Sequence, residues 1–114
     1  MRAYELMIIF DAGIEESEVE ARVEQVSENI SAHGGEVKAE DRWGKRRFAY
    51  EINHQHEGYY TVLELVTETR DMGTLERLLR LADDVVRHKL IRLPDGEAAR
   101  RGLLGDGTPL AAAG

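Results

Sequence analysis

The sequence predicts an α+β domain in which two helices pack on one face of a four-stranded antiparallel sheet. The chain has 114 residues, 42% of them hydrophobic, which is enough for one modest core. Segments of strand composition alternate with two segments of helical periodicity, in the order strand, helix, strand, strand, helix, strand. This order is the reason for the predicted fold class.

The first strand and first helix are predicted at 4–10 and 15–33. Residues 4–10 are almost continuously apolar and are followed by Asp11 and Gly13, which is typical of a central strand covered on both faces. The helix carries one apolar stripe opposite a glutamate-rich face, and two glycines after His33 end it. That stripe consists of Val19, Val23, Val26 and Ile30.

A long hairpin is predicted next. Residues 36–52 alternate apolar and polar side chains, with Gly44 as a bulge or kink, and 53–58 form the loop. Residues 59–67 are rich in tyrosine, threonine, valine and leucine and form the returning strand. We expect its inward side chains to be Tyr59, Leu63 and Leu65, and its outward ones to be Tyr60, Val62, Glu64 and Val66.

The second helix is predicted at 71–81 and the fourth strand at 85–93, at an edge of the sheet. The complete order is that of a ferredoxin-like split β-α-β sandwich, βαββαβ. Right-handed crossovers place the first and third strands in the centre. We therefore predict one domain at 1–93 and a flexible C-terminal tail at 94–114, which is rich in glycine and alanine.

Composition narrows the class of function. The formal net charge of -7 argues against indiscriminate binding of nucleic acid and leaves room for one local basic surface. The chain has no cysteine, no apolar run long enough to span a membrane and no cleavage signature near its start, so we expect a cytoplasmic protein. A domain of this size is not expected to form a deep enzyme cleft, and we predict no cofactor.

A basic and aromatic cluster at 42–50 interrupts the acidic sequence, with four cations between Arg42 and Arg47. Guanidinium groups bind phosphate, and rings stack on bases or pack on proteins. The alternative is an edge strand protected from aggregation by charge. An apolar strip opposite the helices would also suit a docking protein, unless long charged side chains cover it. The members of that strip are Met7, Ile9, Val62 and Val66.

Two histidines, His54 and His56, have a spacing that suits two metal ligands on one side of a strand. A usable site needs further convergent ligands, and only Glu57 is near in sequence. We therefore predict no metal site.

Four motifs together resemble the family of bacterial small-ribosomal-subunit protein six. They are MRAYE at 1–5, GKRRFAY at 44–50, GYY at 58–60 and VVRH at 85–88. The resemblance covers most of residues 1–93. It implies a ferredoxin-like structural constituent of the small ribosomal subunit, not an enzyme, that binds small-subunit rRNA together with ribosomal protein eighteen as a heterodimer.

The resemblance also implies where the partners bind. Arg2, Tyr4 and Arg87 match positions near RNA, and Arg46 and Arg47 match charged positions associated with the protein partner. We predict that Arg92 and Tyr60 join the rRNA-facing set. Arg42 and Trp43, from the same cluster, are predicted to join the partner-facing set.

Two other classes of function stay open at this point. One is a dimeric ferredoxin-like regulatory module that binds a small molecule on its open sheet face. The other is a small dimeric enzyme with His54, His56 or His88 as general base, which needs a carboxylate partner and an enclosed pocket. Neither has a supporting motif in the sequence.

Overall fold

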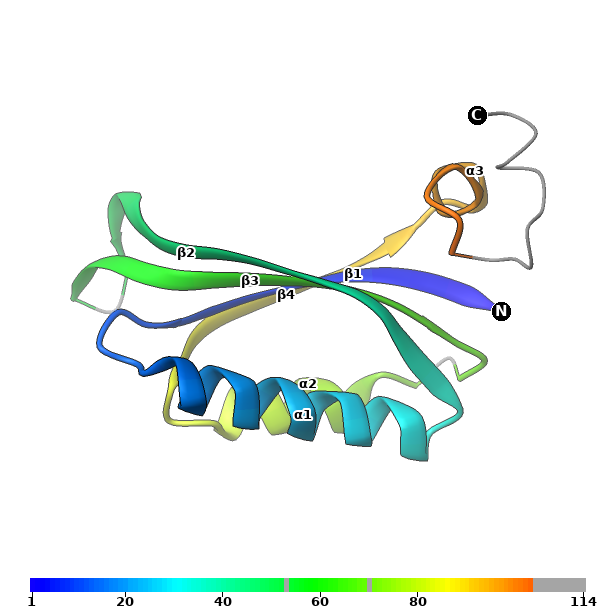
Figure 1. Ribbon diagram of the computed structural model, residues 1–114, viewed down its shortest axis with the longest axis horizontal. Helices are drawn as coiled ribbons and strands as arrows, with labels where there is room; N and C mark the ends of the chain where they lie inside the picture. The colour runs from blue at the N-terminus through cyan, green and yellow to red at the C-terminus, as the bar shows by residue number, and fades with distance from the viewer. Residues whose placement is uncertain (53, 70, 104–114) are drawn as a thin grey trace.

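Two layers make up the molecule: a twisted sheet and, on one of its faces, a pair of helices (Figure 1). The computed structural model describes residues 1–52, 54–69 and 71–103. The strands are β1 (Arg2–Asp11), β2 (Gly35–Ile52), β3 (Gln55–Thr67) and β4 (Val85–Leu93). The helices are α1 (Glu16–Ala32), α2 (Gly73–Leu81) and the short α3 (Asp95–Arg100).

The sheet has the order β2-β3-β1-β4, and each neighbouring pair is antiparallel. The predicted ferredoxin-like topology is therefore confirmed, with β1 and β3 central and β2 and β4 at the edges. Helices α1 and α2 cover one face, and we call the opposite face of the sheet the open face.

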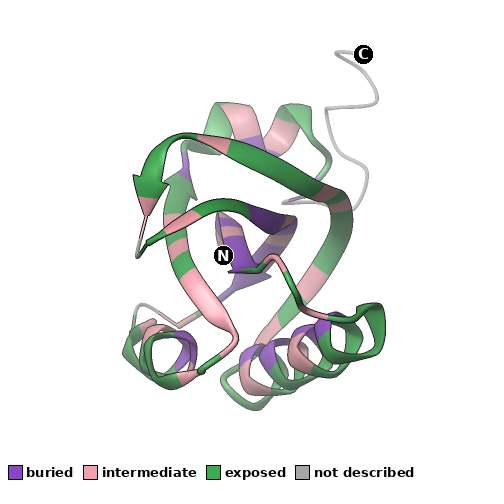
Figure 2. Cartoon of the chain, turned by 90° about the vertical axis from the view of Figure 1, so that its left-hand side faces the viewer, coloured by how far each residue is buried: buried purple, intermediate pink, exposed green. Residues whose placement is uncertain are grey.

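The main core lies between the sheet and helices α1 and α2. Alternate residues of β1 point into it because side chains of a strand alternate between faces. Figure 2 shows the buried residues on the central strands and on the sides of α1 and α2 that face the sheet. The predicted stripe of α1 and the predicted inward residues of β3 are confirmed. The core includes Tyr4, Leu6, Ile8, Phe10, Val19, Val23, Val26, Ile30, Tyr59, Leu63, Leu65, Leu75 and Leu79.

The hairpin between β2 and β3 differs from the prediction. β3 begins at Gln55, which pairs with Ile52, so residues 55–58 belong to a strand and not to a loop. The last residue of β1, Asp11, pairs with Gly58. Residues 55–57 therefore project beyond the central strand, where polar side chains are solvated and no apolar alternation marks the strand.

The C-terminal region also corrects a prediction. Asp95–Arg100 forms α3, and Ala98 and Leu103 are buried in a second small cluster. The expected flexible tail is therefore wrong for residues 95–103, because they fold back onto the open face; residues 104–114 lie outside the described residues. Within the described part of the chain, no helix is both long enough and apolar enough to cross a membrane.

Candidate functional site

A groove runs along the open face at the hairpin end of the sheet. Its volume is about 360 Å³. Met7 and Ile9 of β1 form an apolar floor, and Arg87 and Lys89 of β4 stand beside them because they pair with Ile9 and Met7. The far wall consists of Phe48, Ala49, Tyr50 and Ile52 of β2.

An irregular register bends β2 over this groove. Between the Arg47–Glu57 pair and the Ile52–Gln55 pair, residues 48–51 oppose only His56. Extra residues on one strand make that strand bend and increase its local twist. This bend positions the wall of the groove.

Gly58 permits the close packing at the base of the bend. A Cβ atom at this position would lie 2.6 Å from Ile9 Cγ2 and 2.9 Å from Phe48 Cζ, well inside contact distance. Only glycine leaves room for the Phe48 ring to approach β1. The GYY motif therefore has a packing reason at its first residue.

Trp43 forms the centre of a stack on the open face. Its ring lies parallel to that of Tyr60, with centroids 5.9 Å apart and an interplanar angle of 7°. The Arg46 guanidinium lies 5.1 Å from the Trp43 ring centroid, at cation–π distance. Trp43 Nε1 donates a hydrogen bond to Asp41 Oδ2 at 3.1 Å. The stack thus presents an aromatic surface that remains 40% exposed at Trp43.

The bulge at Gly44 decides which side chains join this stack. Gly44 has a φ of 82°, and the register of β2 with β3 shifts between Arg42 and Gly44. A shift of one residue exchanges the two faces of a strand. Residues after the bulge therefore change faces, which places Arg46 on the same face as Trp43. Arg42 precedes the bulge and points to the other face, toward α1, by the ordinary alternation of a strand.

Arg42 therefore does not lie on the open face with Trp43 and Arg46, and its role in partner binding stays a prediction. Its guanidinium donates hydrogen bonds to Glu40 and to Glu20 of α1. The hydrogen bond with Glu40, opposed by partial burial, raises the pKa of Arg42 above its usual value. Arg42 thus connects β2 to α1.

Arg46 and Arg47 remain available. Among the described residues, neither forms an ion pair, and Arg47 lines a shallow depression beside Gln55, His56 and Glu57. Arg46 and Trp43 thus lie together on the open face, and Arg47 lies at the hairpin beyond it. Of the four residues predicted to face the protein partner, the structure brings these three to the hairpin end.

The residues predicted to face rRNA do not share one surface. Arg87 and Tyr60 lie beside the groove on the open face. Arg92 pairs with Tyr4, whose side chain belongs to the main core, so Arg92 lies on the helix-covered side near the start of β1. Arg2 has the same parity as Tyr4 and lies at the same end of the sheet.

Tyr4 itself does not reach the surface. It is 6% exposed and packs in the main core between the sheet and the helices. Its contact with RNA stays a prediction, and the structure gives its ring a packing role in the core.

Sequence reasoning missed other residues of the open face. Lys89 and Tyr50 were not predicted to form a site, yet both line the groove. The parity of Lys89 with Arg87 along β4 was the signal that could have found it. No sequence signal indicated that Arg101 reaches the sheet, since that contact depends on how α3 folds back.

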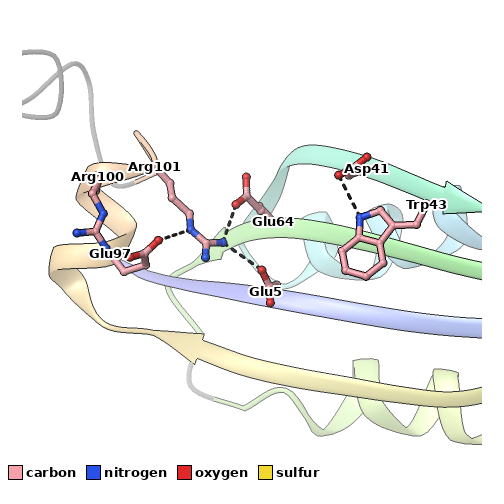
Figure 3. Close-up of polar contacts among 7 residues, drawn as sticks. All are labelled: Glu5, Asp41, Trp43, Glu64, Glu97, Arg100 and Arg101. Atoms are coloured by element: carbon pink, nitrogen blue, oxygen red, sulfur yellow. Dashed lines mark hydrogen bonds and ion pairs between the residues drawn. The ribbon is translucent and has the colours of Figure 1, made fainter. Parts of the chain in front are cut away.

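Arg101 joins α3 to the open face (Figure 3). Its Nη1 lies 2.8 Å from Glu64 Oε2 and 3.1 Å from Glu5 Oε1, and its Nε lies 2.7 Å from Glu97 Oε2. Hydrogen bonds to Glu64 and then Glu5 raise the pKa of Arg101 above its usual value. The guanidinium stays charged and holds three carboxylates together.

His54 and His56 flank the Glu51 carboxylate at 3.9 and 3.4 Å. In the portion of the chain that the structure describes, no group of three or more metal-ligating side chains is arranged so that it could hold a metal ion. These histidines are exposed at the hairpin end of the sheet.

The comparisons with known proteins agree with this geometry. The sequence profile described as Ribosomal protein S6 matches residues 3–92. A protein of Carboxydothermus hydrogenoformans named small ribosomal subunit protein bS6 is 46% identical over 92 residues, which cover 81% of this chain and 96% of that relative. A protein of the same name from Saccharopolyspora erythraea is 44% identical over 81% of this chain and 78% of the relative.

A solved structure, the crystal structure of 30S ribosomal protein S6 from Thermotoga maritima, superposes with a TM-score of 0.78 at 33% identity. The superposition covers 89% of this chain and 95% of that structure. The fold and the matches together define a ferredoxin-like ribosomal protein. More specifically, the chain belongs to the ribosomal protein S6 family, and the resemblance seen in its four motifs is confirmed.

Proposed function

We propose that the chain is a structural constituent of the small ribosomal subunit that binds small-subunit rRNA together with ribosomal protein eighteen. The role is one of assembly and not of catalysis. The observation that carries this proposal is the groove of the open face, where an apolar floor lies between the Trp43–Tyr60–Arg46 stack and the cations of β4. Family membership supports the ribosomal setting.

The protein partner binds the open face at its hairpin end. Apolar and aromatic surface in a concave patch, with arginine at its edge, is the composition of a protein-binding hot spot. Trp43 and Arg46 supply the aromatic anchor and its cation, and Arg47 extends the surface toward the hairpin.

Ribosomal RNA binds the opposite end of the sheet through Arg2 and Arg92. These two cations lie on the same side of adjacent strands, close to the N-terminus. Among the residues that the structure describes, Arg92 has one ion pair, a long one of 3.9 Å with Asp95, so its guanidinium is accessible to phosphate. Arg87 and Tyr60 lie beside the groove, so we place them where the RNA and the protein partner meet.

The composite arrangement explains how an acidic chain binds RNA. A net charge of -7 opposes binding of a polyanion, so a few phosphate contacts are expected to bind weakly alone. A basic partner that docks on the open face extends the positive surface. Affinity for rRNA is therefore expected to depend on ribosomal protein eighteen.

The test is a salt-titrated binding assay with a central-domain rRNA fragment, with and without ribosomal protein eighteen. We expect tight binding only with the partner. The double variant Arg2→Ala, Arg92→Ala should reduce the slope of log affinity against log salt by about 1 to 2, as two lost phosphate contacts predict.

The matched control is Arg77→Ala, because Arg77 is an exposed cation on α2 and belongs to neither proposed surface. It should leave the salt slope unchanged. If the double variant binds like the unmodified protein, the RNA surface is assigned wrongly. If no binding occurs even with the partner, the proposed function is wrong.

A further inference from the structure

The open face is divided into two parts. The hairpin end carries the groove, and the other end lies under α3 (Figure 1). Ala98 and Leu103, which are 0% and 5% exposed, rest on an apolar floor on the sheet. That floor consists of Ala3 of β1, Val66 of β3 and Leu93 of β4.

An electrostatic contact completes this docking. Glu5 and Glu64 are direct cross-strand partners on the open face. Like charges in this position repel, and the Arg101 guanidinium lies within 3.1 Å of both carboxylates. The sheet therefore offers an acidic pair beside an apolar floor, and α3 fills both with one arginine and two apolar side chains.

This docked segment is separable from the rest of the fold. Its apolar cluster shares no residue with the main core between the sheet and helices α1 and α2. A helix of six residues is not stable alone, so α3 persists only while it is docked. Local opening of such a unit leaves the domain folded.

The open face is too small for a standard protein interface to form beside the docked α3. The three neighbouring strand pairs have 10, 8 and 12 paired residues. Four strands with a mean of about ten make a flat area of about 600 Å², from a rise of about 3.3 Å and a strand spacing of about 4.8 Å. One side of a standard protein interface is about 800 Å². A partner that docks on this face with such an interface needs the end under α3 as well as the groove.

We propose that α3 is an internal occupant of the partner-binding face, so that residues 95–103 and a protein partner compete for the apolar floor and the Glu5–Glu64 pair. The inference rests on the proposed function, since it concerns the same face. The partner segment that replaces α3 has the chemistry that α3 displays: an arginine for the two carboxylates and small or apolar side chains for the floor.

Residues 95–103, which lie beyond the part of the chain that the family profile matches, thereby regulate binding of the partner. The family profile ends at residue 92, and α3 begins at Asp95. The apparent association constant for a partner is that of the undocked form multiplied by the fraction of molecules in which α3 is undocked. Variants that undock α3 should therefore bind the partner more tightly without any change in the contacts of the groove.

The experiment uses the full chain and two variants, Arg101→Ser and Leu103→Ser. Arg100→Ala is the matched control, because Arg100 is exposed and forms its ion pair with Glu97 of α3 itself. Hydrogen exchange first reports whether α3 is undocked, through the amide of Leu103, which donates to the Ala98 carbonyl at 2.9 Å. Calorimetry then measures affinity for ribosomal protein eighteen.

We expect faster exchange at Leu103 and an affinity about tenfold higher in both variants, with the control unchanged. Faster exchange with unchanged or weaker affinity would overturn the inference alone, since α3 would then be neutral or part of the interface. Binding that is absent from the unmodified chain and present in the variants would support it strongly. Absence of binding in every protein would refute the proposed partner and the inference with it.

Discussion

Two glycines on the hairpin determine what the open face presents. Gly44, with its φ of 82°, shifts the register of β2 so that Arg46 joins Trp43 on the open face, where Trp43 stacks on Tyr60. Gly58 leaves space for Phe48 to pack against Ile9. Both positions lie within the family motifs, and both act through backbone geometry and not through side-chain chemistry.

Gly58→Ala is expected to lower the free energy of unfolding by about 1 to 3 kcal/mol, the usual cost of overpacking. The added Cβ would lie 2.6 Å from Ile9 Cγ2, so β1 or the Phe48 ring must move. Chemical denaturation measures the change. Gly96→Ala is the control, because nothing lies within 4 Å of its Cβ position, and an unchanged stability in both variants would contradict the packing account.

At the scale of the elements, β3 and α1 are joined by a polar contact at the edge of the core. The Tyr59 hydroxyl donates to Glu16 Oε1 at 3.2 Å, in the first turn of α1. Burial, followed by the nearby Glu16 carboxylate, raises the pKa of Tyr59 above its ordinary value of 10.0. The neutral phenol is therefore the form that the folded protein stabilises.

This contact predicts a pH dependence at the alkaline end. Above about pH 10 the unfolded state loses the Tyr59 proton first, so stability falls as the pH rises toward the folded pKa. Tyr59→Phe should cost about 0.5 to 1.5 kcal/mol near neutral pH and show a shallower decline above pH 10. Urea denaturation between pH 8 and 11 measures both. Tyr50→Phe, at a 70% exposed ring, is the control, and equal slopes for Tyr59→Phe and the unmodified protein would contradict the account.

The elements of the main fold were predictable from the sequence, and α3 was not. In α1 and β3 one face of the element is buried, and the apolar residues of that face recur in the sequence with the period of a helix or of a strand. α3 has six residues, including Gly96, and only one buried side chain within it. Its stability comes from Leu103 and Arg101 docking on distant strands, and no local pattern encodes such a contact.

The residue types of the site were predictable from the sequence, but the face of the sheet on which each residue lies was not. The basic and aromatic cluster does contain Trp43 and Arg46, which stand together on the open face. The bulge at Gly44 was expected, but only the pairing with β3 shows that its one-residue shift puts Arg46 on the face of Trp43. The motif position of Tyr4 suggested a contact with RNA, whereas its strand position buries the ring, so that contact stays a prediction.

For the whole molecule, the two sides of the sheet differ in charge and in role. The solvent face of α1 exposes Glu18, Glu24 and Glu28, which makes this helix unsuitable for a polyanion. The open face combines an apolar groove with Arg46, Arg87 and Lys89. This arrangement reconciles a net charge of -7 with a ribosomal role, since the acidic surface of α1 is separate from both the proposed partner surface and the cations proposed to bind rRNA.

The most direct test of the partner-binding face uses Trp43, the single tryptophan of the chain. Its fluorescence and its quenching by acrylamide are measured during titration with ribosomal protein eighteen, and the same titration of Trp43→Phe corrects for emission from the partner. The account predicts a blue shift and reduced quenching as the complex saturates, because the partner covers the Trp43–Tyr60 stack. A complex that forms while Trp43 stays equally accessible to acrylamide would contradict it.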